Sequence, residues 1–348
     1  MRKFDYDKLK EIHWDSEIIN LVGQIHEYKG RQELYTKQKP EQMARLIEIA
    51  RIQSTEASNA IEGIRTTNTR LRQLIEDKTA PKNRDEEEIM GYRDVLNTIH
   101  ENYEYIPLRP SYILQLHRNL FQYSEKGIGG QFKNVQNYIS ATDRNGNSFV
   151  LFTPVSPWET PQAVREICTA FEKAKNENEI DPLLLIPVFI HDFLCIHPFN
   201  DGNGRMSRLL TTMLLYQSGY MAGKYISLEN KIAKNKEMYY SVLETCQDGW
   251  YQNQDDPVPF IKYLLRIVLA AYRDFEERAE LVNEKVPAYE MVKRTVSERI
   301  GRFTKADILE LCPSISRASV ENSLKKLVDE NYLIRHGAGK NTFYTRTN

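Results

Sequence analysis

The stretch that decides the fold is LLLIPVFIHDFLCIHPFNDGNGRMSRLLTTMLL, residues 183–215, in which a polar loop separates two apolar segments. The first segment is apolar nearly all round, which is typical of a central helix. It follows Asp181-Pro182, a helix N-cap with proline at the first helical position. It should end at His197, because the residue before a proline is pushed out of the α-helical region.

The second apolar segment predicts a helix that begins after the loop and ends near Gly219, a residue suited to the C-cap. Its apolar residues recur at helical spacing: Met206, Leu209, Leu210, Met213 and Leu214. Arg205 and Arg208 lie three residues apart, roughly 140° from the centre of that apolar face. We therefore expect both arginines to point away from the core side of the helix and toward something else.

The polar loop has the composition of a phosphate-binding site. Gly202 and Gly204 flank Asn203, so the backbone can turn several N–H groups toward one point and form a nest for an anion. The following helix adds unpaired N–H groups and a partial positive charge, worth about 0.3–2 kcal/mol for an anion. Arg205 and Arg208 can add charge-assisted hydrogen bonds to phosphate oxygens.

Other residues of the loop indicate catalysis as well as binding. Asp201 would repel a phosphate unless a cation lies between them, and Mg2+ uses one or two carboxylates together with substrate phosphates. His197 can accept a proton near neutral pH and activate an incoming hydroxyl, a role worth about 10² to 10⁴ in rate. Phe199 is expected to anchor the loop to the core. Each feature alone is common in structural turns, but together they account for every polar position of the loop.

Residues 197–208, HPFNDGNGRMSR, resemble the complete HPFx(D/E)GNGRxxR signature of the Fic family without departure. The resemblance implies that His197 is the general base, that Asp201 holds Mg2+ and that Arg208 binds the γ-phosphate of ATP. It further implies four residues that bind the α- and β-phosphates: Gly202, Asn203, Gly204 and Arg205. The implied reaction transfers AMP from ATP to a Ser, Thr or Tyr hydroxyl of a protein and releases pyrophosphate.

The resemblance extends to a flap and to a downstream segment. GGQFKNVQNYI, residues 129–139, is similar to the family's Gly-x-Phe-Arg entry, although Lys133 stands where the family usually has Arg. β-prone stretches flank the turn-prone residues 143–146 and predict a hairpin. The resemblance implies that this hairpin aligns the target segment by strand-like pairing. Tyr239 and Tyr240 are expected either at the adenine or in the core.

An upstream motif predicts a built-in inhibitor. STEASNAIEGIR, residues 54–65, places Ser58 and Glu62 four residues apart, on one face of a helix. It resembles the family's inhibitory motif, (S/T)xxxE(G/N). The resemblance implies that Glu62 pairs with Arg208, so that this arginine is occupied when ATP arrives. In some relatives the same glutamate is thought to activate water and remove AMP, so Glu62 would also make the enzyme bidirectional.

The composition bounds the class of protein. The chain has 348 residues, 41% of them hydrophobic and 27% charged, and a formal net charge of −1, which gives no overall bias toward nucleic acid or membranes. The four cysteines are widely spaced and suggest neither disulfides nor a zinc site. No apolar run is long enough to span a bilayer, and the charged N-terminus lacks the apolar segment of a secretion signal. We expect a cytoplasmic protein with no membrane partner.

The C-terminal residues read as helix, turn, helix and hairpin, an order that resembles a winged helix. From Met291 onward eleven Lys and Arg residues stand against six acids. Ser316 could cap a recognition-type helix that presents Arg317. DNA binding is one interpretation, and target recruitment or self-association is the other, because fold alone does not decide function.

The sequence thus predicts a mainly α protein: a Fic-type helical bundle with a β-hairpin flap and a C-terminal winged helix-turn-helix domain. The expected parts are residues 1–104 with the inhibitory motif, residues 105–284 with the Fic core, and residues 285–348. The leading function is an autoinhibited protein adenylyltransferase that acts on a protein target or on itself, as a homodimer. Two alternatives stay open: a DNA-binding regulator with a nucleotide-sensing or self-modifying core, and transfer of another nucleotide or phosphate-containing group.

Overall fold

The computed structural model describes the chain except residues 1, 39, 77, 126, 143–147, 284–286, 298, 300, 313–314, 340–341 and 348. As predicted, the protein is mainly helical, and its strands form two short hairpins. Short 3-10 helices lie at Tyr6–Glu11, Tyr103–Tyr105 and Trp250–Gln252. The α-helices are α1 (Ser16–Gln38), α2 (Pro40–Ile61), α3 (Asn68–Ile75), α4 (Arg84–Asn102), α5 (Pro110–Leu120), α6 (Thr160–Glu177), α7 (Pro182–Ile196), α8 (Asn203–Gln217), α9 (Ala222–Tyr225), α10 (Leu228–Lys234), α11 (Lys236–Gln247), α12 (Val258–Asn283), α13 (Ala288–Ser297), α14 (Lys305–Leu311) and α15 (Arg317–Asp329).

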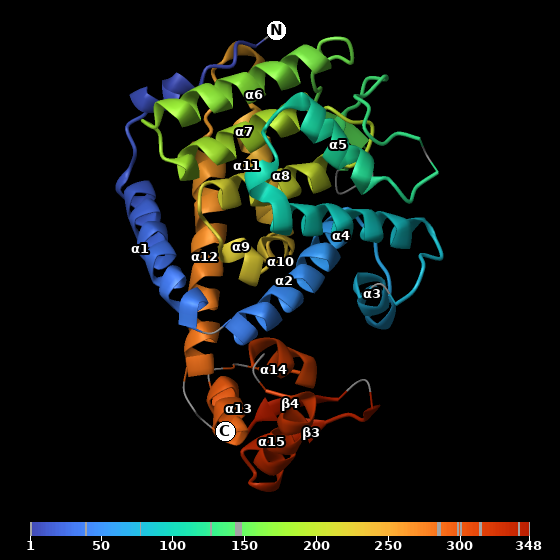
Figure 1. Ribbon diagram of the computed structural model, residues 1–348, viewed down its shortest axis with the longest axis vertical. Helices are drawn as coiled ribbons and strands as arrows, with labels where there is room; N and C mark the ends of the chain where they lie inside the picture. The colour runs from blue at the N-terminus through green and yellow to red at the C-terminus, as the bar shows by residue number, and fades with distance from the viewer. Residues whose placement is uncertain are drawn as a thin grey trace.

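The two apolar segments form the neighbouring helices α7 and α8 at the centre of the body. The side chain of Asp181 accepts a hydrogen bond from the Leu183 N–H and caps α7, which is buried along its whole length. α7 packs against α6, α8 and α12 (Figure 1). It ends at Ile196, as predicted, but His197 is left-handed, with φ +50°, rather than extended as a following proline favours. Gly219 closes α8 with φ +80°.

Arg205 and Arg208 point away from the apolar side of α8, toward polar side chains of α2 and α4, but they are not exposed to water. The two residues are 1% and 4% exposed. They are buried because α2 and α4 pack over the polar side of α8. An apolar stripe shows which side of a helix meets other apolar residues, but it does not show whether the opposite side meets water or polar side chains of other helices.

The N-terminal helices bring the inhibitory motif to α8. α1 runs beside the long α12, and α2 then crosses the body obliquely (Figure 1). α2 packs against α4 and α10, and its C-terminal end reaches α8. Its buried residues follow the helical spacing expected from the sequence: Met43, Leu46, Ala50, Ala57 and Ile61. This packing holds residues 58–62 over the start of α8.

A hairpin precedes α6, as the sequence predicts. β1 (Ile139–Thr142) pairs antiparallel with β2 (Ser148–Phe152), while the predicted turn at residues 143–146 lies outside the described residues. Phe152 stacks on Tyr251, with ring centroids 5.7 Å apart. The end of the hairpin is thereby fixed to the helical body.

The C-terminal module, α13 to β4, has a core of its own. Its helices and the antiparallel hairpin of β3 (Leu333–His336) and β4 (Phe343–Arg346) bury a cluster that includes Val292, Ile308, Val320 and Leu324. Ser316 caps α15, as predicted, by accepting from the Ser319 N–H. The expected boundary at residue 285 lies outside the described residues. The division into three parts and the winged-helix assignment therefore stay predictions.

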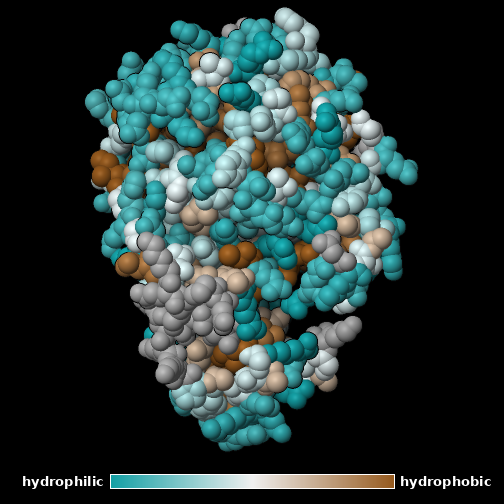
Figure 2. Space-filling view, in the orientation of Figure 1, coloured by the Kyte–Doolittle hydropathy of each residue, from teal (hydrophilic) through white to brown (hydrophobic). Residues whose placement is uncertain are grey.

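The remaining sequence expectations concern thiols and membranes. All four cysteines are buried and form no disulfide. Among the described residues, no helix combines the length and the apolar character needed to cross a bilayer. The face shown in Figure 2 is largely hydrophilic, with hydrophobic residues visible only in scattered spots.

Candidate active site

His197 occupies the junction between α7 and the polar loop. Its Nδ1 lies 3.2 Å from the Leu194 carbonyl oxygen, which can only accept, so Nδ1 carries the hydrogen and Nε2 keeps its lone pair. Burial, with a smaller contribution from the charge of Lys133, lowers the pKa of His197 to about 4 against the opposing effects of the Leu194 carbonyl and Glu62. The imidazole is therefore neutral at pH 7, as a general base must be.

Lys133 and Asn137, which precede the hairpin in the chain, donate hydrogen bonds to backbone carbonyl groups at this junction. Asn137 Nδ2 donates to the carbonyl oxygens of His197 at 3.2 Å and Phe199 at 3.0 Å. Buried Lys133 donates from Nζ to the Ile196 carbonyl at 3.0 Å and to Asn137 Oδ1 at 2.8 Å. Lys133 thus binds backbone oxygens on the flap side of the loop, and burial lowers its pKa to about 8.

Phe199 anchors the loop, as expected, through an aromatic stack. The ring is fully buried and lies on the His117 ring with centroids 3.7 Å apart and planes 3° from parallel. Because Gly130 N–H donates to His117 Nδ1, the hydrogen of His117 is on Nε2, which donates to the Asp201 carbonyl at 3.0 Å. His117 of α5 therefore links the loop, at the Asp201 carbonyl, to the backbone of Gly130.

The glycine nest forms where α8 begins. Gly202 is the N-cap and adopts φ +86°, the left-handed region that favours glycine. Asn203 turns its side chain back onto Phe199, accepting from the Phe199 N–H at 2.9 Å and donating to the Phe199 carbonyl at 2.7 Å. The side chain of Asn203 therefore stabilises the loop, while the backbone N–H groups of the first turn remain as the anion-binding element.

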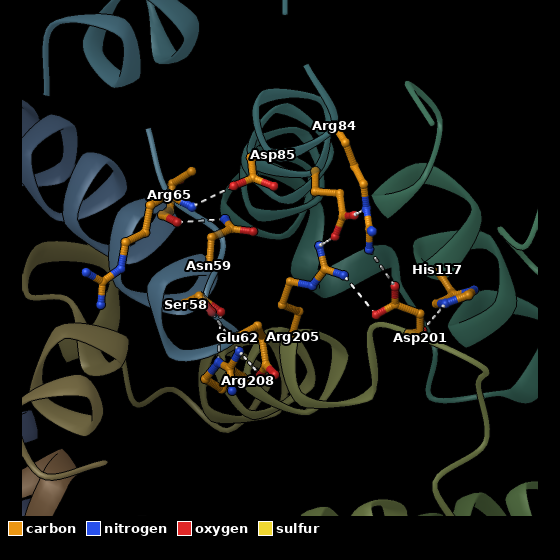
Figure 3. Close-up of polar contacts among 12 residues, drawn as sticks. Ser58, Asn59, Glu62, Arg65, Arg84, Asp85, His117, Asp201, Arg205 and Arg208 are labelled. Atoms are coloured by element: carbon orange, nitrogen blue, oxygen red, sulfur yellow. Dashed lines mark hydrogen bonds and ion pairs between the residues drawn. The ribbon is translucent and has the colours of Figure 1, made fainter. Parts of the chain in front are cut away.

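Arg208 is held by the inhibitory motif (Figure 3). Its Nε donates to Ser58 Oγ at 2.8 Å, and its Nη2 donates to the Ser58 carbonyl at 2.9 Å and to Glu62 Oε1 at 2.8 Å. The ion pair expected between Glu62 and Arg208 is thus present. The guanidinium has three bonds to one short segment, two of them to Ser58.

Glu62 also covers the glycine nest. A Cβ placed on Gly204 would collide with Glu62 Oε1, so the carboxylate lies against the first turn of α8. Glu62 follows the last residue of α2, and Gly63 turns the chain with φ +82°. Lys236 donates to the Ile61 carbonyl at 2.6 Å and closes the end of that helix. An anion of the protein itself occupies the position that suits a phosphate.

Arg205 points toward α4 rather than toward α2 (Figure 3). Its Nη1 lies 2.8 Å from Glu88 Oε2, and its Nη2 lies 3.4 Å from Asp201 Oδ1. The guanidinium carbon sits 5.2 Å from the centre of the Phe121 ring. Asp201 is partly exposed and also has Arg84 Nη2 at 3.7 Å. Among the described residues, no group of three or more His, Cys, Asp or Glu side chains is arranged to hold a metal.

The two tyrosines differ. Tyr239 is 4% exposed and packs with Tyr263 at 5.8 Å, while Tyr240 is 43% exposed with Lys236 over its ring at 5.6 Å. Tyr239 is therefore a core aromatic residue of α11, and Tyr240 is the one of the two that a ligand could contact.

The structure brings together His197, the glycine nest, Arg208 and Glu62, and places Arg205 and Asp201 beside them. Sequence reasoning missed four residues that hold this site: Arg84, Glu88, His117 and Asn137. Glu88 carried a usable signal, because it falls four residues before Tyr92 in the apolar stripe of its helix. His117 carried a similar signal, because it lies four residues after Ile113 and three before Leu120 on the buried side of α5, whereas Arg84 and Asn137 show no such pattern.

Comparison with known proteins agrees with this geometry. Residues 107–215 match the profile of the Fic/DOC family. A probable protein adenylyltransferase of Aquifex aeolicus is 33% identical over 98 residues, 28% of this chain and 27% of that protein. The protein adenylyltransferase Fic of Nematostella vectensis is 25% identical over 234 residues, 64% of this chain and 48% of that protein. The matches thus cover less than half the length of either relative.

Solved structures share the fold. A Fic family protein from Desulfovibrio desulfuricans superposes with a TM-score of 0.62 at 22% identity, covering 97% of both chains. A Fic domain containing signaling protein from Bacteroides thetaiotaomicron gives a TM-score of 0.62 at 24% identity, covering 76% of this chain and 97% of that one. The first of these similarities extends over the C-terminal module as well as the helical body.

Proposed function

Because this chain belongs to the Fic family, we propose that it is a protein adenylyltransferase, moving AMP from ATP to a Ser, Thr or Tyr hydroxyl of a protein. One observation carries the proposal: a partly buried, neutral His197 keeps Nε2 available next to a glycine nest at a helix N-terminus. A base beside an anion site is the arrangement that transfer of a phosphorus group to a hydroxyl needs.

The step would proceed by in-line displacement at the α-phosphorus. The target hydroxyl gives its proton to His197 Nε2 while its oxygen forms a bond to the α-phosphorus. The bond between the α-phosphorus and the oxygen that bridges to the β-phosphate breaks, and pyrophosphate leaves with that electron pair. In this proposal Gly202, Asn203 and Gly204 supply backbone N–H groups to the α- and β-phosphates, with Arg205 behind them and Arg208 on the γ-phosphate.

Asp201 fits a magnesium ligand. Its side chain is 36% exposed, and Mg2+ takes one or two carboxylates and completes its shell with phosphates and water. When bound, Mg2+ would neutralise phosphate charge as pyrophosphate leaves. The contribution of this chain is to hold Asp201 at the edge of the nest through the His117 hydrogen bond to its carbonyl.

The adenine and the target protein would bind on opposite sides of the nest. Tyr240 is the exposed aromatic of α11 and is the better candidate for contact with adenine than the buried Tyr239. The hairpin presents Phe149 and Val150, both about half exposed, to a target strand. The target includes any hydroxyl of this protein that can reach the site, and assembly as a homodimer stays a prediction.

In the resting state, Glu62 would block the reaction. It holds Arg208 and covers Gly204, so the γ-phosphate loses its cation and the nest loses space. Removing the carboxylate should therefore activate the enzyme. The same carboxylate could activate water for removal of AMP from a modified target, which would make Glu62 serve both directions.

The test uses wild type, Glu62→Gly, and Glu62→Gly combined with His197→Ala, each incubated with Mg2+ and ATP labelled at the α-phosphate. Label should appear on protein with Glu62→Gly, be weak with wild type, and vanish in the double variant. ATP binding without label on any protein would overturn AMP transfer and direct attention to other nucleotides. Label from ATP carrying the isotope only at the γ-phosphate would identify phosphate transfer instead.

DNA binding by the C-terminal module has no comparable support. On α15, Arg317 Nε lies 3.1 Å from Glu321 Oε1, and Lys305 lies 2.5 Å from the same oxygen. An acid that engages both cations reduces their attraction for a phosphate backbone. Salt-dependent binding to duplex of random sequence would restore the regulator interpretation.

A further inference from the structure

Glu88 binds two arginines with its two carboxylate oxygens. Oε2 lies 2.8 Å from Arg205 Nη1, and Oε1 accepts from Arg84 Nε at 2.7 Å. Glu88 and Arg205 are each 1% exposed, whereas the side chain of Arg84 is 61% exposed. One arginine is therefore sealed between α4 and α8, and the other reaches over the surface.

The same two arginines meet the two oxygens of Asp201 (Figure 3). Arg205 Nη2 lies 3.4 Å from Asp201 Oδ1, and Arg84 Nη2 lies 3.7 Å from Asp201 Oδ2. Glu88, Arg205, Asp201 and Arg84 thus close a charge ring in which acids and arginines alternate. α4 contributes Arg84 and Glu88 to this ring, the loop contributes Asp201, and the first turn of α8 contributes Arg205.

Glu88 supplies the second negative charge of the ring, so that two carboxylates face two arginines. Arg205 is always charged and is almost fully buried, so it needs an anion beside it. With Glu88 as its buried partner, Arg205 leaves Asp201 at 3.4 Å, longer than a tight charge-assisted hydrogen bond. Without that partner, Arg205 would move onto Asp201 and neutralise the carboxylate proposed for the metal.

We propose that Glu88 is a positioning residue that keeps Arg205 from neutralising Asp201, and that Arg84 is the resting counterion of Asp201, which gives way when a metal–nucleotide complex binds. The inference rests on the proposed function, since it assigns a task to Asp201 there. Arg84 suits an exchangeable role because its contact with Asp201 is long and exposed, and such pairs contribute little to stability. Glu88 suits a fixed role because both partners of its pair are buried.

The experiment measures Mn2+ binding by electron paramagnetic resonance in the Glu62→Gly background, with an ATP analogue that cannot be cleaved between the α- and β-phosphates. Glu88→Gln keeps the shape of the side chain and removes its charge. Glu87→Gln, the adjacent half-buried acid of α4, is the matched control. Arg84→Ala removes the proposed counterion from the surface. Thermal unfolding of each variant verifies that it is folded.

We expect Glu88→Gln to weaken Mn2+·nucleotide binding about tenfold, as the loss of one charge-assisted interaction would. In AMP transfer it should raise KM for ATP more than it lowers kcat. Arg84→Ala should tighten Mn2+ binding by up to about fivefold, because a competing cation is gone. Glu87→Gln should match its parent.

Unchanged Mn2+ affinity in both Glu88→Gln and Arg84→Ala would overturn the inference, as would equal effects of Glu88→Gln and Glu87→Gln. Because Mn2+ binding requires no transfer, its outcome is separate from that of the proposed function. If no variant labels protein and the Mn2+ shifts still appear, the positioning role stands and the reaction is different. If Glu62→Gly labels protein and no Mn2+ shift appears, the reaction stands and the positioning role fails.

Discussion

Two arginines one turn apart on α8 each pair with a glutamate from another helix, and the two pairs differ in how deeply they are buried. Arg205 meets Glu88, in the second turn of α4, and both residues are 1% exposed. Arg208 meets Glu62, just past the end of α2, and that glutamate is 32% exposed. The distances are the same, 2.8 Å in each pair. The difference in function must come from surroundings rather than from the contact itself.

The surroundings make one pair permanent and the other exchangeable. Breaking a fully buried pair leaves a charge without a partner or water, which costs about 3–5 kcal/mol. Glu62 can move into solvent when a phosphate takes its place, because it lies at a helix end beside Gly63. The comparison indicates that α8 uses one arginine to build the site and presents the other to regulation.

The largest expected effect is on stability. Glu88→Ala should lower the free energy of unfolding by about 3–5 kcal/mol, because it strands the buried charge of Arg205. Glu62→Ala should cost less, about 1–3 kcal/mol, because Arg208 keeps two hydrogen bonds to Ser58. Urea unfolding of both variants measures the difference. Equal losses would contradict the distinction between a fixed and an exchangeable pair.

The next effect is on activity. Glu62→Gln keeps the shape of the side chain but weakens its hold on Arg208, and it should raise AMP transfer by about tenfold to a hundredfold. The control is Glu48→Gln, an exposed acid elsewhere on α2 that should leave the rate unchanged. Initial rates of labelling over a range of ATP concentrations give the comparison. A rate equal to wild type in both variants would show that Glu62 does not inhibit the transfer.

Much of this comparison could be predicted from the sequence. The signature at residues 197–208 specified the loop, and the resemblance of residues 54–65 to the family's inhibitory motif implied the pair between Glu62 and Arg208. Both are contiguous motifs in which local spacing fixes which side chains share a face. The helices α7 and α8 followed from the same apolar periodicity.

The other half of the comparison could not be predicted, for physical reasons. The sequence of α8 places Arg205 on the polar side of that helix, but it does not show that α4 covers this side. Glu88 sits in an acidic run, residues 85–88, and its spacing from Tyr92 places it on the apolar side of α4, but only packing shows that its partner is Arg205. His117 and Asn137 bind backbone atoms more than 50 residues away, as their bonds to Asp201 and His197 show. Such contacts depend on the assembled fold.

A smaller activation should come from Ser58→Ala. It removes the Oγ that accepts from Arg208 Nε but leaves Glu62 and the Ser58 carbonyl in place. The loss of one hydrogen bond to a charged group within a set of three should raise transfer by up to about fivefold. Labelling rates of Ser58→Ala and Glu62→Gln, alone and combined, measure the coupling. If the combined variant has the same rate as Glu62→Gln alone, the inhibition depends on the Glu62 carboxylate and not on the Ser58 hydroxyl.

The smallest effect concerns pH and separates the two glutamates. The charge of Glu62 raises the pKa of His197, against the burial that lowers it to about 4. A general base works only when unprotonated, so transfer should rise with pH through this range and be level from pH 6 to 8. Glu62→Gln removes an anion that favours the imidazolium, so its acid limb should move to lower pH. Glu88, whose charge is balanced by Arg205 and Arg84, should leave that limb in place when changed to Gln. Rate profiles between pH 4 and 8 for the two variants and wild type measure these shifts. An equal shift in Glu88→Gln and Glu62→Gln would mean that the two pairs are electrostatically coupled through α8.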